Sequence, residues 1–155
     1  MKILLSQNKH AQIDPQDWPL VSKYKWHYAT GYARRHNGYK KTPVPLHREL
    51  LRAKKGEIID HINGDKLDNR RSNLRICTIS ENAQNSRLPI NNLSGYKGVT
   101  WHKVKMKWLA QIMKDGKQHF LGYFLNAEDG ARAYNEAAMR LHGEFASINM
   151  NLCQK

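Results

Sequence analysis

Cysteine and acidic residues are scarce in this chain of 155 residues, and long apolar runs are missing. The two cysteines, Cys77 and Cys153, stand far apart without the Cys-x-x-Cys spacing of a zinc ribbon. A pair so placed gives no disulfide framework either, which predicts reduced thiols in a cytoplasmic compartment. No segment has the length and apolar character of a membrane span, and the apolar part of the opening MKILLSQNKH is too short for a signal peptide.

Basic residues outnumber acidic ones: 26 Lys and Arg against 13 Asp and Glu give a net charge of +13 and a pI near 9.9. Such an excess favours a polyanionic partner, and nucleic acid is the first candidate. A membrane surface is disfavoured because no strongly amphipathic basic helix accompanies the charge. Residues 1–88 carry +9 and residues 89–155 carry +4. Both parts are positive, which suits a protein that lies along DNA.

Residues 1–45 are predicted to form short strands and turns ahead of the central motif. Residues 34–41 have the composition of a basic hairpin tip that contacts the phosphate backbone. A short helix is expected over residues 46–51, where His47 contacts DNA, braces the site or is purely structural. The predicted DNA contacts of this region are Arg34, Arg35 and Arg48.

The most informative stretch runs from Glu57 to Arg87, EIIDHINGDKLDNRRSNLRICTISENAQNSR. Two short apolar segments flank a polar loop, and the second leads into a capping box at Thr78, so we expect strand, loop, strand and helix. Because successive strand residues face opposite ways, the first strand should end or bend at Asp60-His61. This unit would bring the pair against the helix turn that carries Asn82. An acid, a histidine and an amide oxygen can together hold a hard divalent cation and activate a water.

This stretch resembles the HNH nuclease motif of phage and intron-encoded homing endonucleases, with Asn in place of the last His. The resemblance implies a ββα-metal core over residues 56–87. It also implies one Mg²⁺ or Mn²⁺ per active site, with Asp60 and Asn82 as its ligands. His61 matches the general base, and Asn73 matches the Asn that braces the loop. The arginines placed to grip phosphates beside the site are Arg70, Arg71 and Arg75.

Beyond this motif the pattern changes. Pro, Asn, Ser and Gly make residues 89–94 a linker. Three strands are expected, over residues 98–102, 107–112 and 119–124. An apolar stripe predicts a helix that begins at Asn126 and ends at Gly143. Three antiparallel strands with this helix on one face would leave the other face free, carrying Lys and aromatic residues.

The block from residue 94 to residue 150 resembles the plant ethylene-response-factor (APETALA-type) DNA-binding domain, on the match of Tyr96-Lys97-Gly98-Val99, Lys107-Trp108 and the Ala-rich helix. The resemblance implies a sheet that enters the major groove. Lys97 replaces an Arg of the family and cannot form its bidentate contact with guanine, so the plant target sequence does not carry over. The predicted DNA contacts are Lys97, Trp101, His102, Lys105, Lys107, Trp108, Lys117 and His119.

These features predict an α+β protein. Short strands precede an HNH nuclease core within a domain over residues 1–88, and a three-stranded-sheet DNA-binding domain follows over residues 95–150. The predicted function is metal-dependent, site-selective cleavage of double-stranded DNA by a monomer, without a membrane partner. One alternative is a DNA-binding regulator with an inactive nuclease core. A second is an RNA-binding or ribosome-associated basic protein, which explains the charge but not the Asp-His…Asn spacing.

Overall fold

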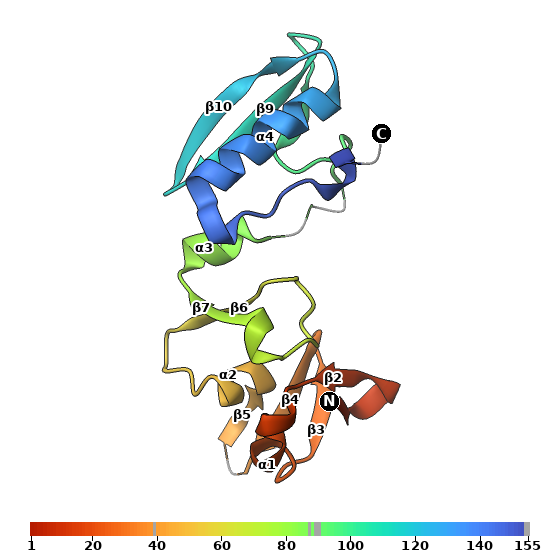
Figure 1. The fold of residues 1–155 in the computed structure, drawn as a ribbon, viewed down its shortest axis with the longest axis vertical. Coiled ribbons are helices and arrows are strands. Elements are labelled where there is room, and N and C mark those ends of the chain that lie inside the picture. Colours follow the sequence, from red (N-terminus) through yellow and green to blue (C-terminus); the bar gives the residue numbers. More distant parts are fainter. Residues whose placement is uncertain (39, 87, 89–90, 154–155) are drawn as a thin grey trace. The chain divides into compact units, whose positions relative to one another are not determined.

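The structure is a computed structural model that describes residues 1–38, 40–86, 88 and 91–153. The chain forms two compact units, Met1–Thr78 and Ile79–Lys155 (Figure 1). The predicted end of the nuclease core at Arg87 and the start of the predicted linker at residues 89–90 lie outside the described residues. The linker and the domain boundary before it therefore stay predictions.

Short strands and helices build the first unit. Its strands are β1 (Lys2–Leu4), β2 (His10–Gln12), β3 (Trp26–Ala29), β4 (Tyr32–Asn37), β5 (Lys40–Pro45), β6 (Ile58–His61) and β7 (Leu74–Cys77). Its helices are α1 (Trp18–Val21) and α2 (Leu46–Leu50). β1 pairs with β2, β3–β4–β5 form an antiparallel sheet in that order, and β6 pairs with β7. The short strands predicted ahead of the nuclease core are confirmed.

The core of the first unit gathers branched side chains from most of these elements. Its buried members include Ile3, Leu5, Ile13, Val21, Leu46, Leu50 and Leu74. The loop between β6 and β7 is tied to the N-terminal strands, because Gln12 N donates to Leu67 O at 2.7 Å and Asn69 N donates to Gln12 O at 2.8 Å. These bonds fix the hairpin that carries Asp60-His61 against the rest of the unit.

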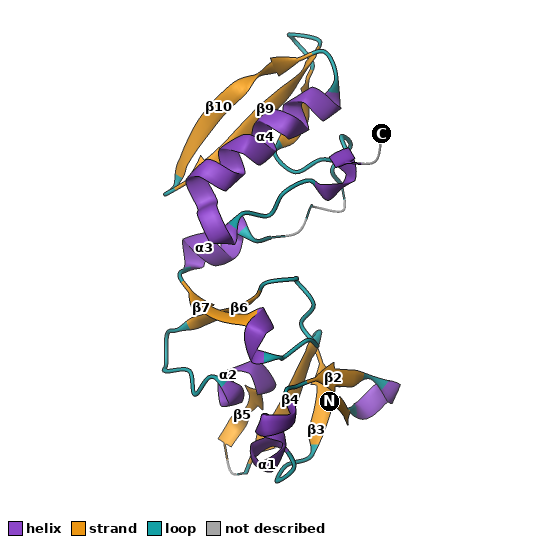
Figure 2. Cartoon of the chain, viewed as in Figure 1, coloured by secondary structure: helices purple, strands orange, loops and turns teal. Residues whose placement is uncertain are grey.

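The second unit is a sheet with a helix on one face. Its elements are α3 (Ile79–Gln84), β8 (Val99–His102), β9 (Lys107–Lys114), β10 (Lys117–Phe124) and α4 (Ala127–His142). The strand order is β10–β9–β8, all antiparallel, and α4 runs across one face of the sheet (Figure 2). The predicted three-stranded sheet with one packed helix is confirmed, with Asn126 at the start of α4 and Gly143 at its end.

Small residues let α4 pack closely on the sheet. A Cβ at Gly130 would lie within 3.5 Å of Phe124, Ala110 and Val99. Val99, Ala110 and Ala131 are fully buried at this contact. In the part of the chain that the structure describes, no helix is both long enough and apolar enough to cross a membrane.

Candidate active site

The β6–β7 hairpin presents the Asp60-His61 pair. In its antiparallel register Asp60 lies opposite Arg75, and His61 lies opposite Leu74. The strand ends at His61, as predicted, and a tight turn follows in which Gly64 N donates to His61 O at 2.7 Å. Gly64 has a φ of 69°, which glycine adopts without a Cβ clash. The Asn-Gly dipeptide thus lets the chain leave the ladder directly after the histidine.

His61 is buried between two rings and beside one amide. Its ring centroid lies 6.1 Å from that of Tyr32 and 5.2 Å from that of His47, and its Nε2 lies 3.4 Å from Asn69 Oδ1. Burial lowers the pKa of His61 below its ordinary value, although Asn69 and the carboxylate of Asp60 oppose this shift. The imidazole is therefore neutral at pH 7, which is the form that accepts a proton.

His47, on α2, packs against the ring of His61. Its ring meets that of His61 edge to face, at an interplanar angle of 83°, and its centroid lies 5.2 Å from the ring of Tyr32. Burial, with a smaller repulsion from His61 and nearby arginines, lowers the pKa of His47 to about 3. Its Nδ1 is buried and has no hydrogen-bond partner among the described residues. His47 thus packs as a neutral ring.

Asp60 leaves the strand on the side opposite to His61 and pairs with Arg75. Its Oδ2 accepts hydrogen bonds from Arg75 Nε at 2.9 Å and from Nη2 at 2.7 Å. Both side chains are mostly shielded from solvent, with 7% of Asp60 and 12% of Arg75 exposed. Two charge-assisted bonds fix the orientation of the carboxylate. The contact of Arg75 with a DNA phosphate stays a prediction.

A divalent cation at this site would find few protein ligands among the described residues. Within the described residues, no group of three or more His, Cys, Asp and Glu gathers to hold a metal ion. Mg²⁺ is commonly held by only one or two carboxylates, with waters and substrate phosphates filling the other positions. Asp60, next to His61 in the sequence but on the other side of β6, offers one such carboxylate.

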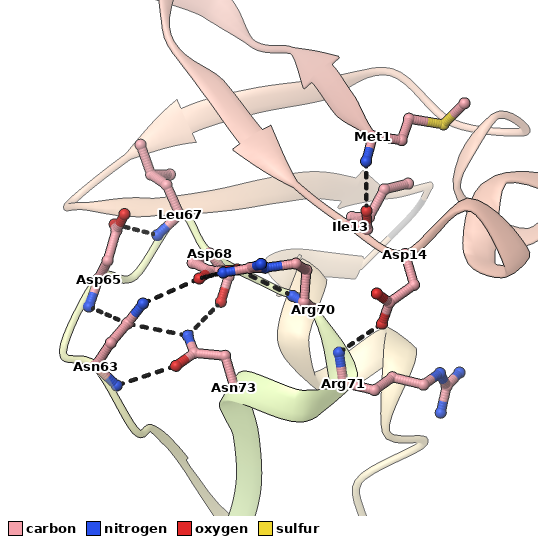
Figure 3. Close-up of polar contacts among 10 residues, drawn as sticks. All are labelled: Met1, Ile13, Asp14, Asn63, Asp65, Leu67, Asp68, Arg70, Arg71 and Asn73. Atoms are coloured by element: carbon pink, nitrogen blue, oxygen red, sulfur yellow. Dashed lines mark hydrogen bonds and ion pairs between the residues drawn. The ribbon is translucent and has the colours of Figure 1, made fainter.

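Side-chain hydrogen bonds hold the polar loop between β6 and β7 (Figure 3). Asn73 Oδ1 accepts from Asn63 N at 3.0 Å, and its Nδ2 donates to Asn63 Oδ1 at 3.0 Å and to Asp68 O at 2.7 Å. Asp68 is almost fully buried and accepts a further bond from Asn63 Nδ2 at 2.9 Å. Asn73 therefore links both ends of the loop that starts at His61. Asp68 and Asn69 were not among the predicted site residues. The many Asn and Asp residues of the loop are the sequence feature that could have indicated them.

Arg70 and Arg71 each bind a buried carboxylate. Arg70 Nε and Nη2 donate to the two oxygens of Asp68 at 2.8 and 2.6 Å. Arg71 Nη2 donates to Asp17 Oδ1 at 2.7 Å, and its backbone N–H donates to Asp14 Oδ2 at 2.8 Å. The two arginine side chains remain 48% and 42% exposed. Each guanidinium is thus held by a carboxylate and is still partly exposed to solvent. The contacts of both arginines with phosphates stay predictions.

Arg48, on α2, points toward the chain that enters β6. Its Nη1 donates to Glu57 O and its Nη2 to Lys54 O, both at 2.6 Å. These bonds tie the loop ahead of β6 to α2. Arg48 thus fixes the start of the strand that carries the Asp-His pair, and a contact of Arg48 with DNA stays a prediction.

The predicted basic hairpin is formed by β4 and β5. Arg34 and Arg35 lie within β4, before the tip, and residue 39 at the tip lies outside the described residues. Arg35 is mostly shielded and pairs with Glu49 at 2.8 Å. Arg34 is half-buried. Their contacts with DNA stay predictions.

The helix of the predicted motif, α3, belongs to the second unit. It begins at Ile79, directly after the predicted cap, and Asn82 is exposed on it. Asp60, His61 and Asn73 therefore lie in the first unit, and Asn82 lies in the second. A metal ion shared by Asp60 and Asn82 stays a prediction.

One face of the C-terminal sheet is free of α4. The register places His102, Lys107, Phe120 and Tyr123 on this free face. The rings of His102 and Phe120 lie 5.2 and 5.1 Å from that of Tyr123, and Phe120 is 62% exposed. The free face carries Lys and aromatic residues, as expected. Phe120 and Tyr123 were not among the predicted contacts, because the bulge after Phe120 changes the strand's alternation.

Trp101 and Trp108 are cross-strand partners whose rings meet edge to face at 5.1 Å. Trp108 packs on the buried cluster of Val99 and Ala110, which lies on the α4 side of the sheet. Exposed positions on this sheet and its turns include Lys105, Lys117 and His119. The contacts of all these residues with DNA stay predictions.

Comparison with known proteins places these elements in a family. The family model described as HNH endonuclease matches residues 52–84. An uncharacterized HNH endonuclease, L560, of Acanthamoeba polyphaga mimivirus is 34% identical over 146 residues, covering 90% of this chain and 74% of that protein. Protein 3.8 of Escherichia phage T7 is 38% identical over 92 residues, covering 59% of this chain and 75% of its own length.

The C-terminal region matches plant factors. AP2-like ethylene-responsive transcription factor TOE2 of Arabidopsis thaliana is 41% identical over 63 residues, which is 41% of this chain and 13% of that protein. No solved structure matches the chain. The mimivirus relative is aligned over most of both proteins, and the family model covers the Asp-His hairpin and α3. This chain belongs to the HNH endonuclease family.

Proposed function

We propose that this chain is a metal-dependent, site-selective DNA endonuclease of the homing type, which hydrolyses phosphodiester bonds in one or both strands of duplex DNA. The observation that carries the proposal is the pair at the end of β6, a neutral His61 beside an Asp60 held by Arg75. Membership of the HNH endonuclease family supports nuclease chemistry. We further propose that the protein acts as a monomer in the cytoplasm.

His61 acts as the general base in this proposal. Because its lowered pKa keeps the ring neutral at pH 7, a ring nitrogen takes a proton from the water that attacks phosphorus. The contact with Asn69 and the packing against Tyr32 and His47 hold the imidazole plane. Asn73 keeps the adjoining loop in place. The expected products carry 5′-phosphate and 3′-hydroxyl ends.

Asp60 and Asn82 would hold one Mg²⁺ or Mn²⁺. Their oxygen atoms are of the kind that hard cations prefer. A bound cation stabilises the negative charge that develops on the phosphate and the leaving oxygen. Arg75 keeps the Asp60 carboxylate oriented through two hydrogen bonds.

Recognition of DNA would fall mainly to the second unit. The similarity of this region to a plant transcription factor supports binding of duplex DNA. The free face of the sheet carries a cation, Lys107, and the exposed rings of Phe120 and Tyr123. A broad sheet face with few charges suits contact with base edges, whereas exposed arginines suit phosphates.

Cleavage of a random duplex library tests the proposal. The full chain is incubated with the library in Mg²⁺, in Mn²⁺ and in EDTA, and the product ends are sequenced. We expect cuts only with metal, at a restricted set of sequences. Tight duplex binding without any cut in either metal would instead support a DNA-binding regulator with an inactive nuclease core.

A further inference from the structure

Lys97, one of the predicted DNA contacts, binds backbone carbonyl groups within its own unit. Its Nζ donates to Gln84 O at 2.6 Å and to Ser86 O at 2.7 Å, the carbonyls of the last residue of α3 and of a residue two positions after it. A helix leaves its last carbonyls without intrahelical partners, and a lysine ammonium is a favourable partner for them. Burial lowers the pKa of Lys97 to about 8, so the group is still mostly charged at pH 7.

The backbone of Lys97 is held on both sides. Its N–H donates to Asn149 Oδ1 at 2.7 Å, and its carbonyl accepts from Asn149 Nδ2 at 3.2 Å. The next residue, Gly98, has a φ of 76° and lies so close to Tyr134 that a Cβ would come within 2.0 Å of the ring. The point from which the lysine reaches α3 is therefore rigid.

The helix that Lys97 holds is short and mostly exposed. α3 has six residues, Ile79–Gln84, and of these Gln84 is the one with a buried side chain. A helix of this length is not stable by itself, so packing or a capping partner must keep it in place. Residues of α3 and of the sheet line a cavity of about 400 Å³, which includes Ala83, Thr100 and Gln111. Thr100 and Gln111 belong to strand positions of the free face, so α3 borders the surface that would read DNA.

We propose that Lys97 is a positioning residue of the nuclease, which holds the end of α3 beside the free face of the C-terminal sheet and thereby fixes the exposed Asn82. The inference rests on the proposed function, because Asn82 matters only as a metal ligand. It assigns two tasks to one unit: the sheet reads DNA, and the helix pinned to that sheet supplies a ligand to the metal. Binding of the correct site and placement of Asn82 would then be coupled.

Three variants of the full chain test this inference. Lys97→Met keeps the aliphatic stem and removes the ammonium, Lys97→Arg keeps a charged donor, and Lys103→Met removes an exposed lysine from the turn after β8 as a matched control. One measurement is amide exchange at Asn85 and Ser86, whose N–H groups close the last turn of α3 onto Glu81 O and Ala83 O. This measurement requires neither metal nor DNA. The second is the single-turnover cleavage rate at saturating protein, with duplex affinity measured in parallel.

We expect Lys97→Met to raise exchange at both amides by roughly ten-fold, since hydrogen bonds from a charged group are lost. We expect its cleavage rate to fall by roughly 10- to 100-fold, as for other groups that orient a metal ligand. Its duplex affinity should fall no more than that of Lys103→Met, and Lys97→Arg should recover most of the rate.

Unchanged exchange in Lys97→Met would overturn the inference, and so would raised exchange with an unchanged cleavage rate. A loss of duplex affinity that fully accounts for the slower cleavage would also overturn it, by making Lys97 a DNA contact. If the wild-type protein does not cleave, the proposed function fails, and the exchange measurement still decides whether Lys97 holds α3.

Discussion

The two units bury different kinds of side chain. Among the described residues, the buried polar groups of the first unit are Asp17, His47, Asp60, His61, Asp68, Asn69 and Asn73, whereas those of the second are Gln84 and His142. A buried polar group destabilises a protein unless hydrogen bonds compensate, and in the first unit Asn73 and Asp68 make several. The first unit thus buries two histidines together with hydrogen-bonded Asp and Asn side chains.

The second unit has a mainly apolar interior and large side chains exposed on one face of its sheet. One of its two buried clusters is made of the small apolar residues Val99, Ala110 and Ala131, and the other adds Ile112 and Tyr134. Large side chains such as Phe120 stand exposed on the opposite face. Catalysis requires a group whose pKa and orientation are set by its surroundings, whereas reading DNA requires exposed groups on a stiff platform. The contrast in burial is what the proposed division of tasks would require.

Removal of the second unit should have the largest effect. A fragment of residues 1–78 keeps the whole core of the first unit but lacks Asn82, so it should fold and show no metal-dependent cleavage. A fragment of residues 1–93 regains α3 without Lys97, and we expect slow nicking with little site preference. Plasmid nicking and circular dichroism of both fragments decide this. Cleavage by folded 1–78 at the rate of the full chain would show that the first unit is sufficient.

Salt should weaken duplex binding steeply. The first unit carries 16 basic and 7 acidic residues (+9), and the second carries 10 and 6 (+4). If about six to ten phosphates are contacted, affinity should fall by roughly 10³ to 10⁵ between 50 and 200 mM salt. Replacing Lys107 and Lys117 by Gln should reduce the steepness of the plot of log affinity against log salt concentration by roughly 2. A nearly flat response of the wild-type chain in binding isotherms would contradict a long interface along the backbone.

Acid should destabilise the first unit through His47. Its pKa is about 3 in the folded protein and 6.5 when unfolded, so the unfolded state binds more protons between these values. Stability is then lost as the pH falls from 6.5 toward 3, by at most about 5 kcal/mol. His47→Phe should remove this loss, in urea unfolding followed at several pH values. The exposed His10 gives the control His10→Phe, and identical acid sensitivity in His47→Phe and the wild type would refute the prediction.

The smallest effect is expected at the free face of the sheet. Phe120→Ala should weaken duplex binding by roughly five-fold, about 1 kcal/mol, through lost apolar contact with DNA. The free energy of unfolding should hardly change, because 62% of the side chain is exposed. Met106→Ala, at an exposed turn residue, is the control. Equal affinities of the two variants would show that this face does not contact DNA.

Sequence patterns predicted the elements of this protein better than the partners of its long side chains. The end of β6 at Asp60-His61 followed from the alternation of strand residues, and the bounds of α4 followed from Asn126 and Gly143. These features are local, because each depends on residues a few positions apart. The hairpin that presents Asp60-His61 was therefore predictable.

The inward contacts of Arg48 and Lys97 were not predictable in this way. Their carbonyl partners lie at Glu57 and Gln84, and only the folded chain brings those groups within reach. A composition rich in basic residues indicates DNA binding for the whole surface and does not identify which cations hold the protein together. The bulge in β10, which brings Phe120 to the free face, likewise depends on pairing with β9.

Substitution of His61 tests the central claim most directly. The single-turnover cleavage rate of His61→Ala is compared with that of the wild type and of the exposed-histidine control His10→Ala, in Mg²⁺ at saturating protein, with duplex affinity measured alongside. We predict a rate lower by roughly 10²- to 10⁴-fold, the usual contribution of a general base, and a duplex affinity within a few-fold of the wild type. Cleavage by His61→Ala near the wild-type rate would contradict the assignment of the active site.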